Sequence, residues 1–158
     1  YNRVVRDLNG LTAGQFVEAV SKVYNIVSKG TMCQRPIHKG QASMLVEDTW
    51  YLLEVKAEYK SNDPVDGLDV AILQNHVLSP ILGIDDPKTD KRIDFVGGIR
   101  GIGELERRVK TDSKAAFAMY PTSIHELFAV ADAGMLMPPK STWFEPKLRS
   151  GLFIHAIN

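Results

Sequence analysis

The segment Ser43-Met44-Leu45-Val46-Glu47-Asp48-Thr49-Trp50-Tyr51-Leu52-Leu53-Glu54-Val55-Lys56-Ala57-Glu58-Tyr59 decides the fold class of this chain. In its second part, one set of alternate positions is apolar or aromatic: Tyr51, Leu53, Val55, Ala57 and Tyr59. The positions between them carry charges: Glu54, Lys56 and Glu58. A period of two is typical of a strand with one buried and one wet face. Residues 43–47 and 50–59 are therefore predicted to form an antiparallel hairpin.

Before the hairpin, the sequence predicts a strand and a helix. Residues 3–8 read as a short strand that the turn pair Asn9-Gly10 closes. Thr12 and Gln15 fit a capping box, which starts a helix. The apolar residues that follow recur at helical spacing: Phe16, Val17, Val20 and Tyr24. We expect this helical region to end at residues 28–30.

After the hairpin, helices and strands interleave. Asp63 is placed to cap a helix whose first residue is Pro64 and which carries apolar residues from Leu68 to Leu78. Short strands are predicted at 93–96, 115–120 and 151–157, and a helix follows the glycines at 97–103. Ser123 and Glu126 fit a second capping box, with four residues predicted on its helix's buried side: Ile124, Leu127, Phe128 and Ala131. The pattern predicts an α+β fold, with one mixed sheet and several packed helices in one domain.

The composition fits one soluble domain. The chain has 158 residues, 44% of them hydrophobic and 24% charged, which is close to average soluble usage. Its 19 basic and 19 acidic residues balance, so we expect no nucleic-acid partner and no membrane partner. The single Cys33 allows no internal disulfide, and no apolar run approaches the length of a membrane span. These features predict a cytoplasmic protein.

Several blocks of the chain carry a family resemblance. They are Tyr1-Asn2-Arg3-Val4-Val5, Asp7-Leu8-Asn9-Gly10-Leu11, Leu68-Asp69-Val70, Leu82-Gly83-Ile84, Thr89-Asp90-Lys91-Arg92-Ile93-Asp94-Phe95-Val96-Gly97-Gly98-Ile99-Arg100-Gly101, Tyr120-Pro121-Thr122-Ser123, and Met137 to Leu152. Through these blocks the sequence resembles the C-terminal half of the Domain of Unknown Function 1015 family. The family has no settled biochemical function, so the resemblance leaves the reaction and the cofactors unknown.

The resemblance implies that this chain is part of a longer protein. Tyr1 opens directly into a predicted strand, so we expect an upstream half that is absent from this sequence. Full-length family members carry an Asp-Gly-His-His-Arg element there, similar to motifs of the ParB-like nucleotide-binding superfamily, which includes free-serine kinases. By this remote analogy the protein handles phosphate or nucleotide, and residues 1–158 have no turnover alone. The alternative is a structural or regulatory domain that supports the N-terminal half.

A glycine-rich loop is the first candidate site. Gly97-Gly98-Ile99-Arg100-Gly101-Ile102-Gly103 joins a predicted strand to a predicted helix. Glycines let backbone amides approach a phosphate, and Arg100 can add a bidentate contact. The spacing is neither the dinucleotide fingerprint nor a P-loop, and glycines also satisfy ordinary turn geometry. Anion binding at Gly98, Arg100 and Gly101 and a plain structural turn both remain open.

The second candidate precedes that loop. Asp90, Lys91 and Arg92 are followed by Asp94. One interpretation is a salt-bridged strand end. The other is an acid positioned beside two cations for metal-phosphate or general-base chemistry.

The third candidate is the loop at residues 138–150. It holds three cations (Lys140, Lys147 and Arg149), three hydroxyls (Ser141, Thr142 and Ser150) and two aromatic residues (Trp143 and Phe144). Loops on a rigid scaffold often hold binding sites. Its polar groups can bind phosphate, or the loop is simply pinned to the surface by its aromatic residues. We predict that this loop and the Gly97–Gly103 loop form one anion-binding face.

Other kinds of site have little support in the sequence. The four histidines lie far apart and Cys33 has no cysteine partner, so we predict no metal site. No Gly-x-Ser-x-Gly elbow is present, and Cys33 is expected to be a passive thiol. The catalytic residues are left unassigned. Apolar surface exposed where the upstream half docks is expected to favour self-association.

Overall fold

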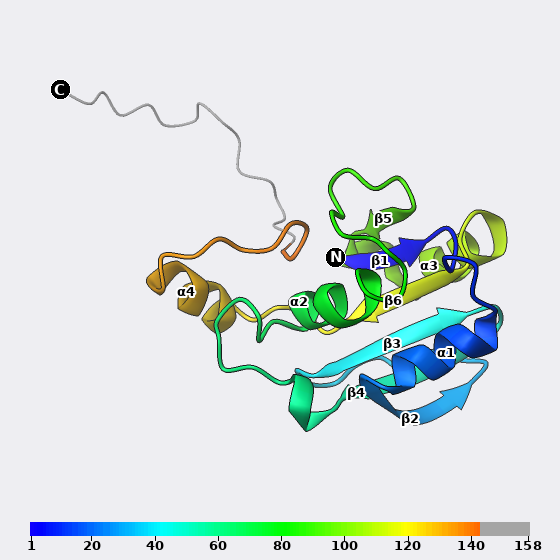
Figure 1. The fold of residues 1–158 in the computed structure, drawn as a ribbon, viewed down its shortest axis with the longest axis horizontal. Helices are drawn as coiled ribbons and strands as arrows, with labels where there is room; N and C mark the ends of the chain where they lie inside the picture. The colour runs from blue at the N-terminus through cyan, green and yellow to red at the C-terminus, as the bar shows by residue number, and fades with distance from the viewer. Residues whose placement is uncertain (143–158) are drawn as a thin grey trace.

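The computed structural model describes residues 1–142, which form one six-stranded sheet with helices on both faces (Figure 1). The strands are β1 (Asn2–Val5), β2 (Tyr24–Gly30), β3 (Gln41–Val46), β4 (Thr49–Val55), β5 (Ile93–Val96) and β6 (Ala115–Met119). Their order across the sheet is β2-β4-β3-β6-β1-β5. The α+β class is confirmed.

All the strand pairs among residues 1–142 are antiparallel, so the predicted mixed sheet is wrong in its strand directions. The prediction came from the interleaving of helices and strands, which often accompanies parallel crossovers. Here β1 lies between β5 and β6 and runs opposite to both. The helices between the strands therefore return the chain without building a parallel pair.

The predicted hairpin is confirmed as β3 and β4, with Val46 opposite Thr49 and Met44 opposite Tyr51. The second strand is shorter than predicted, because β4 ends at Val55 and Ala57–Tyr59 form a 3₁₀ turn. Val55 is also the last residue of β4 that pairs with β2. The apolar alternation continues past this point without a neighbouring strand, so backbone pairing decides where the strand ends.

The helices are α1 (Ala13–Ser21), α2 (Asp69–Leu73, continued by a π turn at Gln74–Leu78), α3 (Gly101–Thr111) and α4 (Ile124–Asp132), and a 3₁₀ turn covers Gly98–Arg100. Both predicted capping boxes are present, at Thr12 with Gln15 and at Ser123 with Glu126. The first helix is shorter than predicted: Tyr24 opens β2 instead of extending α1. The predicted helix start at Pro64 is wrong as well, because α2 begins at Asp69 and Asp63 instead accepts the amides of Val65 and Asp66 in a turn. The edge strand β2 was missed because its mostly exposed residues do not alternate, and a bulge interrupts it between Ile26 and Ser28.

The two faces of the sheet carry different helices. The larger core lies between the sheet and helices α1 and α2, and includes Phe16, Leu73 and Phe117, all fully buried. The smaller core lies under α3, where Leu105 packs against residues that include Val4 and Trp50. In Figure 1, α1 and α2 lie in front of the strands and α3 lies behind them. Because β1 and β6 are antiparallel, the start of β1 lies beside the end of β6, where the chain leaves the sheet toward α4.

Helix α4 is packed differently from the prediction. Ile124 and Phe128 were assigned to its buried side, yet 54% and 56% of their surfaces are exposed. Val130 is the fully buried residue of α4, and it packs against α2 in a cluster with Leu68, Val70 and Ala71. Besides these residues the cluster includes Met119 at the end of β6, so α4 packs on α2 and on this edge of the sheet. This contact covers a narrower stripe of the helix than its amphipathic spacing implied.

Some predictions fall on residues beyond the described range. These are the closing strand at 151–157 and the cations Lys147 and Arg149. Within residues 1–142, every helix is too short or too polar to cross a lipid bilayer.

Candidate functional site

The glycine-rich loop turns the chain from β5 into α3. Strand β5 ends at Val96, residues 98–100 form the 3₁₀ turn, and α3 begins at Gly101. Gly101 has a φ of +72°, which favours glycine over residues with a side chain. The first turn of α3 has no side-chain cap. The predicted change from strand to helix at this loop is confirmed.

A cavity of about 340 Å³ lies beside this loop. Its lining joins the glycine loop to the 138–142 segment and to the chain that follows β6: Tyr1, Asn2, Val70, Gly98, Met119, Tyr120, Pro121, Thr122, Ser123, Ile124, Leu127, Ser141 and Thr142. An adjoining cavity of about 430 Å³ shares Asn2, Gly98 and Met119 to Pro121, and adds Arg35, Gly101 and Ile102. The two candidate loops therefore contribute residues to one cavity, through Gly98, Ser141 and Thr142.

The 138–142 segment is held in place by polar contacts to other parts of the fold. Arg3 Nη2 donates to the carbonyl oxygen of Lys140 at 3.5 Å, and Arg3 Nη1 donates to the carbonyl of Tyr1. Thr122 Oγ1 donates to the carbonyl of Ser141 at 3.4 Å, and the Ser141 hydroxyl donates to Pro138. Lys140 Nζ lies 5.5 Å from the centre of the Tyr1 ring. These contacts hold the 138–142 segment against the start of β1.

Arg3 lines neither cavity, but it carries a buried positive charge that contacts the lining residue Tyr1. Only 3% of its surface is exposed, and its guanidinium lies 5.6 Å from the centre of the Phe95 ring. Burial lowers the pKa of Arg3 to about 10, which leaves it charged at neutral pH. Within residues 1–142 its hydrogen bonds go to backbone carbonyls and not to a carboxylate. The charge is therefore solvated by peptide dipoles and not neutralised by an anion.

Further cations lie at the rim. Arg35 lines the adjoining cavity, and Arg100 lies between the lining residues Gly98 and Gly101. The side chains of Arg35 and Arg100 are exposed, and across residues 1–142 neither makes an ion pair. Exposed cations without a protein partner remain available to a ligand.

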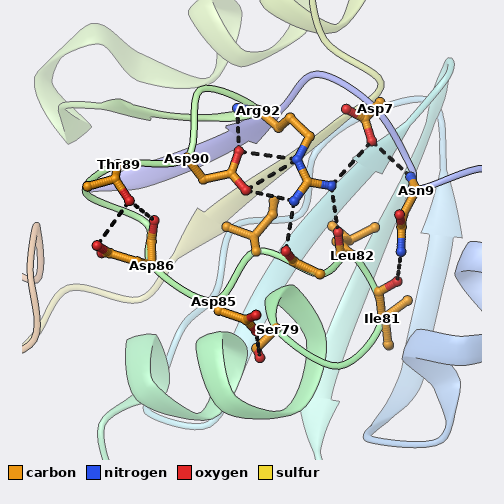
Figure 2. Close-up of polar contacts among 12 residues, drawn as sticks. Asp7, Asn9, Ser79, Ile81, Leu82, Asp85, Asp86, Thr89, Asp90 and Arg92 are labelled. Atoms are coloured by element: carbon orange, nitrogen blue, oxygen red, sulfur yellow. Dashed lines mark hydrogen bonds and ion pairs between the residues drawn. The ribbon is translucent and has the colours of Figure 1, made fainter.

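Asp90 and Arg92 lie in a network of ion pairs and hydrogen bonds, the Arg92 clamp, which Figure 2 shows in detail. Arg92 Nη2 lies 2.6 Å from Asp90 Oδ2 and also donates to the carbonyl of Gly83 at 2.7 Å. Arg92 Nη1 donates to the carbonyl of Leu82 at 2.9 Å and lies 3.9 Å from Asp7 Oδ1. Hydrogen bonds from Arg92 hold the pKa of Asp90 below its usual value. The guanidinium is thus engaged by three segments of the chain.

Asp94 and Lys91 also lie apart from the cavity. Asp94 Oδ2 lies 2.8 Å from Arg108 Nη1, and the Nε of Arg108 lies 2.7 Å from Asp112 Oδ1. Hydrogen bonds to Asp112 and Asp94 raise the pKa of Arg108. Lys91 is exposed and makes no ion pair within the part of the chain that the structure describes. Asp90, Lys91, Arg92 and Asp94 line neither of the two cavities.

Several lining residues were not proposed from the sequence. Asn2, Arg35 and Tyr120 to Ser123 come from three separate segments, and none stands in a motif with ligand spacing. The run Tyr120-Pro121-Thr122-Ser123 was noticed only as part of the family resemblance. Its place directly after a strand is the one signal that could have pointed to it.

Metal and thiol chemistry find no support in the described part of the chain. Residues 1–142 contain no group of three His, Cys, Asp or Glu side chains placed to hold a metal ion. Cys33 is half-buried, and burial raises the pKa of its thiol. A raised pKa lowers the thiolate fraction at neutral pH, which makes Cys33 a poor nucleophile.

Comparison with known proteins gives a family and no function. No curated protein and no solved structure matches the chain. The model of the family described as "Protein of unknown function (DUF1015)" matches residues 1–71, which run from β1 into the start of α2. The resemblance seen in the sequence is confirmed over this range. Residues 1–71 are thus similar to the DUF1015 family of proteins of unknown function.

Proposed function

We propose that this domain binds a small phosphate-containing molecule in the cavity between the Gly97–Gly103 loop and the 140–142 segment. The observation that supports the proposal is that Gly98, Ser141 and Thr142 line the same cavity although more than forty residues separate them in the chain. The loops meet where β5 and β6 end, beside the buried charge of Arg3.

The groups around the cavity suit an anion. Gly98 and Gly101 bring backbone close to the space that a ligand would fill, since neither carries a side chain. Arg100 can supply a planar fork for phosphate oxygens, and Lys140 can supply a point charge. The Thr142 hydroxyl adds a further donor, and Tyr120, which lines both cavities, can contact an apolar or planar part of the ligand.

The experiment is a titration of the protein with inorganic phosphate, pyrophosphate and AMP, followed by backbone-amide NMR. We expect saturable shifts at residues 98–103 and 140–142 with at least one of these anions. No heavy atom lies within 4 Å of a Cβ built on Gly98, so Gly98→Val places its side chain in the open space without disturbing the fold. This variant should lose the shifts.

The matched control is Gly14→Val, because Gly14 in α1 also has no heavy atom within 4 Å of its built Cβ and lines neither cavity. It should bind like the unaltered protein. Shifts spread evenly over exposed lysines and arginines, or equal binding by the two variants, would show that the cavity is not the site.

The exposed apolar side of α4 favours a second candidate, a structural or regulatory domain that supports an N-terminal half of the protein. In α4, Ile124 and Phe128 expose 54% and 56% of their surfaces, and Leu136 in the chain after the helix exposes 88%. If this candidate holds, no phosphate compound binds, and replacing Ile124 and Phe128 by serine reduces self-association in analytical ultracentrifugation. For either function we propose the cytoplasm as the compartment, in keeping with a single cysteine.

A further inference from the structure

A separate cavity of about 300 Å³ lies at the start of β3, between the end of β4 and the first residues of α2. Its lining is mainly polar: Lys39, Gly40, Val55, Lys60, Ser61, Asn62, Gly67, Asp69 and Ile72. It shares no lining residue with the two cavities beside the glycine loop. Its volume is at the lower end of the range for small-molecule sites.

Two glycines shape the walls of this cavity. Gly40 has a φ of +90°, and a Cβ built there would lie 3.2 Å from Val55 Cγ1. Its amide donates to Asp69 Oδ1 at 2.9 Å, which holds that carboxyl at the cavity wall. A Cβ on Gly67 would lie 2.4 Å from the carbonyl oxygen of Ser61, so only glycine lets the 61–67 loop close so tightly.

The charges around the cavity do not balance. Lys39 Nζ lies 2.8 Å from Glu126 Oε1, and Lys60 Nζ lies 4.0 Å from Glu54 Oε1. His38 Nε2 also faces Glu54, at 3.6 Å. Both lysines thus have a carboxylate partner, whereas Asp69 contacts no cation within residues 1–142 and accepts only the Gly40 amide. Three carboxylates face two lysines.

The protonation of Asp69 reflects this imbalance. Its pKa is raised to about 6, mainly by burial and also by nearby Glu126 and Glu54, while the Gly40 amide and Lys39 act in the opposite direction. The fold therefore disfavours the ionised form of Asp69, and a positive charge brought into the cavity would stabilise that form.

We propose that this cavity binds a small organic ammonium compound whose cationic group contacts Asp69. Ser61 and Asn62 stand at the exposed rim, where they can bond a hydroxyl on the same molecule. A metal ion is a poorer fit, because Glu54 and Glu126 are already paired with lysines, and the described residues place no three ligands together. The proposal does not depend on phosphate binding at the other site.

The test is a titration with ethanolamine, with ethylene glycol as the neutral probe of similar size, following the amide signals of Gly40 and of residues 61–69 at about pH 8. We expect ethanolamine to cause saturable shifts there, and ethylene glycol to cause none. In Asp69→Asn, which retains an oxygen to accept the Gly40 amide, we expect affinity to fall about tenfold or more. The control Asp48→Asn removes a carboxylate in the exposed β3–β4 turn and should leave affinity unchanged.

A second arm repeats the titration at about pH 5, where Asp69 is largely protonated and affinity should fall by a similar factor. Other ionisable groups also face this region: His38, Glu54, Glu126, Lys39 and Lys60. The comparison with Asp69→Asn, whose affinity should change much less with pH, therefore isolates Asp69. Equal binding by Asp69→Asn and the unaltered protein, equal shifts with ethylene glycol, or no saturable shift with ethanolamine would overturn the proposal.

Discussion

Arg92 Nη2 lies 2.6 Å from Asp90 Oδ2, and the same guanidinium donates to the carbonyl oxygens of Leu82 and Gly83 (Figure 2). One side chain thus joins the start of β5 to the chain that leaves α2. Leu82 and Gly83 lie in the turn after Leu78, outside any helix or strand, so their carbonyls depend on side chains or water for hydrogen bonds.

Arg92→Lys should therefore lower the midpoint of thermal unfolding by several degrees, although it keeps the positive charge. A lysine is a point charge and cannot bond Asp90, Leu82 and Gly83 together as a planar fork does. Circular dichroism during heating measures the change, with Lys91→Arg as the control at a neighbouring exposed cation. If Arg92→Lys melts with the unaltered protein, the clamp is not structural, and chemistry at Asp90 and Arg92 is the better interpretation.

Two glycines should respond in opposite directions to alanine. At Gly67 the new Cβ would lie 2.4 Å from the Ser61 carbonyl oxygen and 2.7 Å from that of Asp63, so the loop must open and the fold loses stability. At Gly103, within α3, a Cβ meets no heavy atom within 4 Å. There the substitution should raise the free energy of unfolding by about 0.5–1 kcal/mol, because alanine costs less backbone entropy in a helix.

Urea unfolding of both variants measures these differences. A destabilised Gly103→Ala would show that α3 begins later in the chain than Gly101, with Gly103 still in the loop.

The stability of the protein should depend on Asp69 between pH 4 and pH 7. Its pKa rises from 3.8 to about 6 on folding, so the folded state holds more protons in this range. The stability linked to Asp69 is therefore fully present below about pH 4 and is lost as pH rises through about 6, by up to roughly 3 kcal/mol. Asp69→Asn should be more stable than the unaltered protein at pH 8, by roughly 1–3 kcal/mol, and no more stable at pH 4.

Unfolding by urea at several pH values, with Asp48→Asn as the exposed control, checks this dependence. A variant that is less stable than the unaltered protein at pH 8 would mean that the Asp69 carboxylate is well solvated in the fold.

The parts of the fold that the sequence predicted are those set by local pattern. The alternation from Tyr51 to Val55 and the two capping boxes each depend on residues within one or two turns of chain. The exposed edge strand β2 and the end of β4 at Val55 depend on a partner strand, which no local pattern records. The exposure of Phe128 likewise depends on α4 resting on α2, and no spacing within α4 shows that.

The candidate sites divide in the same way. The glycine loop and the polar residues at 140–142 stand out in the sequence, and the structure brings Gly98 and Ser141 to one cavity. The hydrogen bonds from Arg92 to the carbonyls of Leu82 and Gly83 could not be predicted, because every residue has a backbone carbonyl and the residue types do not show which ones accept. That Asp69 has no cationic partner among the described residues follows only from the structure, in which Lys39 pairs with Glu126 and Lys60 with Glu54.

Arg100→Ala and Lys140→Ala should each weaken the binding of phosphate or nucleotide about tenfold, since each removes one charged hydrogen bond to the anion. Arg100 is exposed and Lys140 contacts the Tyr1 ring, so both variants should keep the fold by circular dichroism. Isothermal titration calorimetry measures the affinity, and raising the salt concentration should weaken binding in the unaltered protein more than in either variant.

Arg107→Ala serves as the control. Arg107 lies in α3, which begins within the glycine loop, but its side chain is paired with Glu104 at 2.7 Å. If Arg107→Ala weakens binding as much as Arg100→Ala does, general attraction to a basic surface explains the affinity, and the two loops do not form a specific anion site.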